Sequence, residues 1–151
     1  MLVVYSEYLT KALSCVIISR QALSNYKMLR IKDMKNKAAY NVQQAIEYIL
    51  KYEIYNNSSY DEEKSIVQIY THDIEKLIKK YCQPYGVYVP KKIILNSKLY
   101  SSWEAESRYS LSCSVRIDSI ITALNEIEKW LIKIKPRYKS NINRAKSKLN
   151  L

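Results

Sequence analysis

The scarcity of glycine and proline constrains this chain more than any other feature of its sequence. Among its 151 residues, glycine occurs once, at Gly86, and proline three times, at Pro84, Pro90 and Pro136. These two residue types form tight turns and interrupt helices, so a chain poor in both has few places to turn sharply. β-Meanders and β-sandwiches, which need many turns, are therefore disfavoured, and the sequence predicts long helices.

Hydrophobic residues recur at helical spacing in five segments. These segments span about residues 3–23, 34–55, 71–81, 96–112 and 115–134, while residues 61–70 fit either a helix or an extended linker. Asp33 and Thr71 are the expected N-caps of the second and third segments. Residues 83–92 form the expected main loop. Five amphipathic segments with short connections predict an all-α fold, an up-and-down bundle of four to five helices.

Positive charge is concentrated near the end of the sequence. The formal net charge is +11, and residues 129–151 include eight basic side chains and no acidic one: Lys129, Lys133, Lys135, Arg137, Lys139, Arg144, Lys146 and Lys148. We expect one helical domain over residues 1–136 and a basic C-terminal tail over residues 137–151. Such a tail suits an anionic partner such as RNA or a nucleotide. A solvated surface, or codon bias in an AT-rich genome, would also explain much of the charge.

Several classes of protein are disfavoured by composition. The three cysteines, Cys15, Cys82 and Cys113, are far apart, and His72 is the only histidine, so a zinc site is not expected. No metal or other cofactor is predicted. Scattered cysteines in odd number are typical of a reducing, cytoplasmic location. Neither a signal peptide nor a membrane span is recognisable, and no membrane partner is expected.

Three short strings occur in a definite order along the chain. Residues 39–51 read AYNVQQAIEYILK, residues 71–77 read THDIEKL, and residues 103–110 read WEAESRYS. Each string alone is only an amphipathic helix. In the first string, Glu47 and Lys51 have the spacing of a favourable surface pair. Together the strings resemble the HEPN family (higher eukaryotes and prokaryotes nucleotide-binding), whose members show a "QQAxExxLK" helix, a "THDL" helix start and a later "ARYP"-like helix end.

The resemblance implies a helical bundle that usually forms a homodimer, with a cleft for RNA or nucleotide. It also implies a role in toxin–antitoxin or phage-defence modules, in which many members pair with a minimal nucleotidyltransferase. Some members are metal-independent ribonucleases that use an arginine followed four to six residues later by a histidine. This chain departs from that pattern, because Ser112, Cys113 and Ser114 occupy those positions after Arg108. Serine and cysteine replace imidazole poorly in proton transfer near neutral pH.

The sequence therefore predicts a catalytically degenerate protein that binds RNA or nucleotide. The expected binding residues are His72, Arg108, Tyr109, Lys129, Lys133, Arg137, Lys139 and Arg144, and Arg108 is the one candidate catalytic residue. Alternatively, His72 only helps to start its helix, and Arg108 only pairs with Glu104. Gln43 and Gln44 would then be packing or solvated residues. Two other functions stay open. One is an active ribonuclease, and the other is a scaffold that docks a partner protein through residues 115–134.

Overall fold

The described parts of the chain are built from helices. The computed structural model describes the backbone of residues 2–57, 71–109 and 115–149, and the side chains of residues 7–56, 71–103 and 115–149. Its elements are α1 (Leu2–Leu29), α2 (Lys32–Asn57), α4 (Ile74–Lys76) continued by a π-helix (Leu77–Cys82), a 3₁₀ turn (Gln83–Tyr85), α5 (Lys91–Leu95), α6 (Ser97–Tyr109), α7 (Ile117–Ile134) and α8 (Tyr138–Lys148). The predicted all-α bundle is confirmed, and five of these helices are longer than ten residues.

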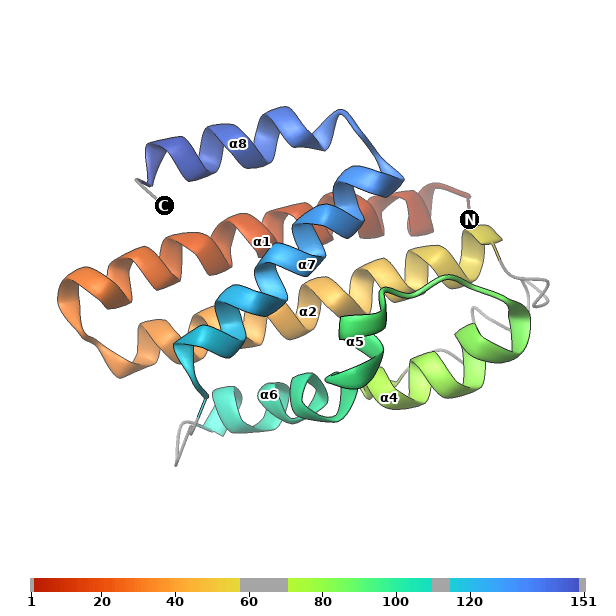
Figure 1. Cartoon of the computed structure of the whole chain (residues 1–151), viewed down its shortest axis with the longest axis horizontal. Coiled ribbons are helices and arrows are strands. Elements are labelled where there is room, and N and C mark those ends of the chain that lie inside the picture. Colours follow the sequence, from red (N-terminus) through yellow and green to blue (C-terminus); the bar gives the residue numbers. More distant parts are fainter. Residues whose placement is uncertain (1, 58–70, 110–114, 150–151) are drawn as a thin grey trace.

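Helix α2 lies at the centre of the bundle. It pairs with α1 along most of its length and also contacts α6, α7 and the π-helix. Figure 1 shows α1 and α2 as an antiparallel hairpin, which α7 crosses obliquely. Helix α8 turns back beside α1, whereas α4 and α6 lie on the opposite side of the hairpin. Helices α4 and α8 are therefore separated by the two long helices.

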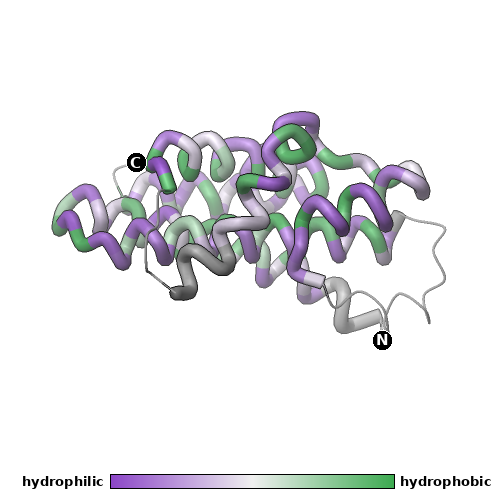
Figure 2. Tube along the Cα trace, turned by 90° about the horizontal axis from the view of Figure 1, so that it is seen from below, coloured by the Kyte–Doolittle hydropathy of each residue, from purple (hydrophilic) through white to green (hydrophobic). Residues whose placement is uncertain are grey.

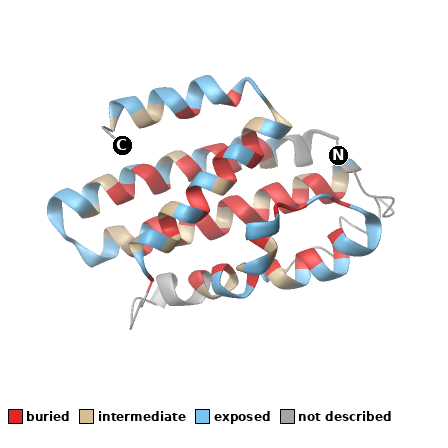
Figure 3. Cartoon of the chain, viewed as in Figure 1, coloured by how far each residue is buried: buried red, intermediate tan, exposed pale blue. Residues whose placement is uncertain are grey.

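The hydrophobic core follows the apolar spacing of the sequence. Along α7, Ile120, Leu124, Ile127 and Leu131 are fully buried, as the spacing predicts for a face that packs inward. Figure 3 shows buried residues concentrated on α2 and on the sides of α1 and α7 that face it. Figure 2 shows the matching alternation of hydrophobic and hydrophilic residues along the helices. The face of residues 115–134 considered for partner docking is thus largely part of the core.

Two predicted helix caps are wrong. Asp33 lies inside the first turn of α2, which begins at Lys32. The cap of α4 is Asp73, whose carboxylate accepts a hydrogen bond from the Lys76 N–H at 3.1 Å. Thr71 instead accepts a hydrogen bond from the Asp73 N–H at 3.1 Å, so it shapes the turn before the helix. The ambiguous residues 61–70 lie outside the described residues.

The segment expected as a basic tail contains helix α8. Tyr138 and Ile142 are buried on α8, and Ala145 and Leu149 are half-buried on the same face. Their spacing of four, three and four residues is helical. The lysines, asparagines and serines between them make the segment polar overall, so its composition alone suggests a tail. Helix α8 contacts α1 and α7, so its positive charges are held on a folded surface.

Candidate functional site

The expected binding residues fall into separate places. Lys129 and Lys133 lie on α7, and Lys139 and Arg144 lie on α8, which Arg137 precedes directly. His72 lies before α4, on the other side of the α1–α2 hairpin (Figure 1). Arg108 and Tyr109 belong to the last turn of α6, but their side chains lie outside the described residues. The fold therefore gathers the C-terminal cations and keeps His72 apart from them.

His72 belongs to a polar network centred on a buried carboxylate. The Nδ1 atom of His72 and the Nζ atom of Lys51 each lie 2.8 Å from Oε1 of Glu47. Gln43 donates to Oε2 of Glu47 at 3.3 Å and to the backbone carbonyl of His72 at 3.0 Å. The Glu47 side chain is 3% exposed and that of Lys51 is 11% exposed. The predicted surface pair is therefore a buried one.

This network accounts for several residues of the first two strings. A buried carboxylate is stable only when it is paired and hydrogen-bonded, and here every partner is polar or cationic. Because a carboxylate only accepts hydrogen bonds, it favours the His72 tautomer that carries its hydrogen on Nδ1. The His72 side chain remains 57% exposed. Its contact with α2 goes beyond the expected role of starting α4, since it joins the entry of that helix to the centre of the bundle.

A second buried network connects α1, α7 and α8. Arg20 of α1 donates to both carboxylate oxygens of Glu128, at 3.1 and 2.7 Å, and to the Asn125 side chain at 3.0 Å. Lys146 of α8 lies 3.1 Å from Oε1 of the same Glu128. This arrangement holds α8 against the bundle, and it uses the charge of Lys146 internally. No local pattern predicts this contact, because Arg20 and Glu128 are 108 residues apart.

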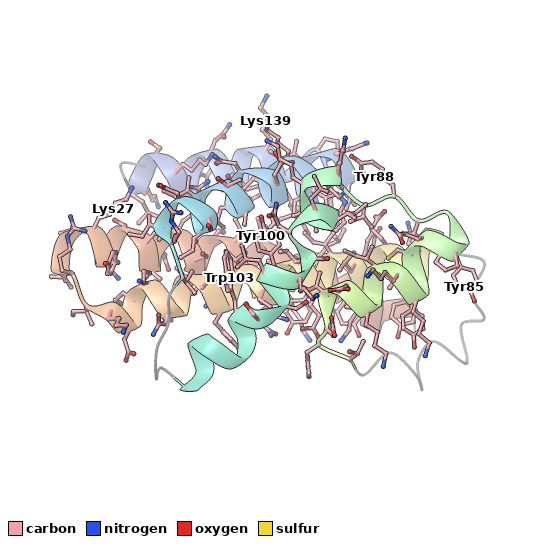
Figure 4. The ribbon with its side chains drawn as sticks, turned by 60° about the horizontal axis from the view of Figure 1, so that its bottom comes forward. Lys27, Tyr85, Tyr88, Tyr100, Trp103 and Lys139 are labelled. Atoms are coloured by element: carbon pink, nitrogen blue, oxygen red, sulfur yellow. The ribbon has the colours of Figure 1, made fainter. Side chains whose placement is uncertain are left out.

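Most of the remaining C-terminal cations have no acidic partner among the described residues. Lys129 also has an acidic partner, Glu126, at 3.7 Å. The other six have no ion pair with a described residue: Lys133, Lys135, Arg137, Lys139, Arg144 and Lys148. Lys139 projects outward from α8 in Figure 4. We refer to these six residues as the C-terminal basic surface.

A shallow groove lies within this surface, between α1 and α8. Arg144 and Lys148, one turn apart on α8, line it together with the amide side chains of Gln21 and Asn141. Its volume is about 270 Å³, and none of the described residues that line it is acidic. One guanidinium group and one ammonium group, beside two side-chain amides, can donate hydrogen bonds to the oxygens of a phosphate group.

The two described cysteines are poor reactive groups. Burial raises the pKa of the Cys15 thiol to about 11, with a smaller contribution from the charge of Glu47. Burial likewise raises the pKa of Cys82 to about 12, with a contribution from Glu53. Thiolates are the nucleophilic and metal-binding form, so both thiols are inert near neutral pH. Among the described residues, no group of three or more His, Cys, Asp or Glu is placed to hold a metal ion.

Comparisons with known proteins leave the family open. No protein-family model, curated protein or solved structure matches the chain. The HEPN resemblance therefore stays a prediction based on the three strings. No helix of the described residues is long and apolar enough to cross a membrane.

Proposed function

We propose that this chain is a HEPN-like protein that binds RNA or a nucleotide without cleaving it. The observation that supports this most directly is the C-terminal basic surface, in which six cations lack ion-pair partners among the described residues. A surface that neutralises phosphates releases condensed counterions, and this supplies sequence-independent affinity for RNA. The groove of Arg144 and Lys148 offers one defined phosphate contact within it.

The rest of the proposal depends on the resemblance. We propose that the protein acts in the cytoplasm, as a homodimer, in a toxin–antitoxin or phage-defence module. Its partner protein would then be a minimal nucleotidyltransferase. The missing histidine after Arg108 supports binding without cleavage. RNA incubated with pure protein in EDTA tests this point, since cleavage that disappears in Arg108→Ala would show an active ribonuclease instead.

RNA binding itself is tested by a salt titration with a labelled single-stranded RNA. The variant Arg144→Gln/Lys148→Gln removes the one phosphate contact of this groove, so the slope of log K against log salt should become shallower by about 0.7, the value for one neutralised phosphate of a single strand. The control Lys79→Gln/Lys80→Gln removes the same charge from exposed positions on the π-helix. It should leave the slope near that of the wild type. Binding that is independent of salt, or an equal change in both variants, would contradict the proposed surface.

A further inference from the structure

A second groove, larger and more aromatic, lies where α2 ends against α7. Its volume is about 560 Å³, and Tyr52 and Glu53 of α2, Tyr88 of the following loop, and Trp130 and Lys133 of α7 line it. Small-molecule sites typically fall in the range of about 300–1,000 Å³, with apolar or aromatic walls and a few polar groups. This groove has that composition, and it is separate from the groove between α1 and α8.

The fold holds Tyr88 in place as an exposed wall of this groove. Tyr88 is 53% exposed, whereas its neighbours Val87 and Val89 are each 6% exposed. Gly86, with φ of 70°, makes the left-handed turn that starts this stretch, and the Val87 N–H donates to the Cys82 carbonyl at 3.0 Å. Two buried valines therefore fix the backbone on both sides of Tyr88, and its ring can receive a ligand with little ordering cost.

A cation, the Lys133 ammonium, lies over the Tyr88 ring. The Nζ atom of Lys133 is 3.9 Å from the centroid of the Tyr88 ring, and Lys133 has no ion pair with a described residue. Glu53, which is 7% exposed, and the exposed Asn56 also line the groove. A carboxylate and an amide can accept hydrogen bonds from the exocyclic amino group of a base, and a carboxylate has room for several donors.

From these contacts we infer that the groove binds one nucleoside monophosphate unit, with its base against the face of the Tyr88 ring that Lys133 does not cover and its phosphate at Lys133. The ligand is either a free nucleotide or an unpaired nucleotide of single-stranded RNA, because a base held in a duplex cannot stack on a side chain. This inference rests on the proposed function and names the part of the ligand that the C-terminal basic surface does not recognise. A simple anion such as phosphate would contact Lys133 but would not explain the exposed ring of Tyr88, whereas a nucleotide uses both.

Isothermal titration calorimetry with AMP, ribose 5-phosphate and adenosine tests the inference directly. The wild type should bind AMP more tightly than ribose 5-phosphate, which lacks the base, and more tightly than adenosine, which lacks the phosphate. Tyr88→Ala should weaken AMP binding by about 5- to 150-fold, the range of one base–aromatic stack. Tyr85→Ala is the matched control, because Tyr85 is also an exposed tyrosine of this loop but lies farther toward the end of the molecule (Figure 4).

The phosphate contact has its own matched pair of variants. Lys133→Gln should remove the preference for AMP over adenosine, whereas Lys129→Gln, one turn earlier on α7 and outside the groove lining, should retain it. Equal binding of AMP and ribose 5-phosphate, or no effect of Tyr88→Ala, would overturn the inference. So would the absence of AMP binding at millimolar concentration.

A final comparison separates this inference from the proposed function. Single-stranded oligoadenylate that binds more tightly than AMP, and loses affinity in Tyr88→Ala, identifies an RNA nucleotide as the ligand; equal affinities identify the free nucleotide. If AMP fails to bind while RNA binding still depends on salt and on Arg144, the groove inference is wrong and the proposed function stands. If AMP binds as described and RNA does not, the groove inference stands and the RNA-binding proposal is wrong.

Discussion

Removing the carboxylate of Glu47 should destabilise the protein far more than removing an exposed carboxylate that also pairs with a lysine four residues later. Glu47 and Lys51 form an i,i+4 pair whose side chains are 3% and 11% exposed. In Glu47→Ala, the largely buried Lys51 side chain loses its acceptor. Breaking a buried pair in this way costs about 3–5 kcal/mol. For a chain of this length, that corresponds to a melting temperature lower by about 6–20 °C.

The exposed pair Glu75 and Lys79 provides the matched control. It has the same residue types and spacing, and its Nζ–Oε1 distance is 2.6 Å, but its side chains are 27% and 68% exposed. Glu75→Ala should therefore cost only about 0.5 kcal/mol. Urea unfolding followed by far-UV circular dichroism measures both variants. Losses that agree within about 1 kcal/mol would show that the buried position of Glu47 and its additional partners add no cost.

The double variant Glu47→Met/Lys51→Met extends the same reasoning. It removes both charges and keeps similar side-chain volume, so no buried ammonium is left without an acceptor. Gln43 retains its hydrogen bond to the His72 carbonyl. The double variant should therefore be more stable than Glu47→Ala. A double variant that is less stable than the single one would contradict this account of the cost.

Three further predictions concern other parts of the bundle. Glu128→Ala leaves the buried guanidinium of Arg20 without its carboxylate, and urea unfolding should show a loss of about 3–5 kcal/mol. Ile142→Ala, on the buried face of α8, should cost about 2–4 kcal/mol if this helix is docked, whereas an unfolded tail would show no loss. Cys15 and Cys82 should resist iodoacetamide at pH 9 in the folded state, as read by peptide mass spectrometry, because their pKa values are raised to about 11 and 12. Their raised pKa values also imply a contribution to stability that is complete below pH 9 and lost as pH rises through 11–12.

Local patterns were sufficient to predict the helices but not their surroundings. The stripe in residues 115–134 and the proline that follows it correctly predict α7, which ends at Ile134. The spacing of Glu47 and Lys51 is equally local, and it correctly predicts that the two side chains meet. It does not reveal that α2 is covered by α1, α6, α7 and the π-helix, since that depends on contacts with segments far along the chain. A surface pair and a buried pair therefore look the same in the sequence.

The aromatic groove was beyond prediction for a related reason. The chain contains 15 tyrosines, and no motif marks Tyr88 as a ligand-binding residue. Its role depends on the meeting of the end of α2, the loop after Gly86 and the end of α7. The alternation of Val87, Tyr88 and Val89 was the one available signal, because it predicts an exposed side chain between two buried ones.

The two buried charge networks differ in when their partners become available during synthesis. Gln43, Glu47 and Lys51 lie on one helix, so the α1–α2 hairpin can satisfy this carboxylate as soon as it leaves the ribosome. Arg20 must wait for Glu128, 108 residues later, before its charge can be buried. Contacts between near neighbours form early in folding, and distant ones form late. The hairpin is therefore expected to form first and to stay open on the side of Arg20 until α7 closes over it.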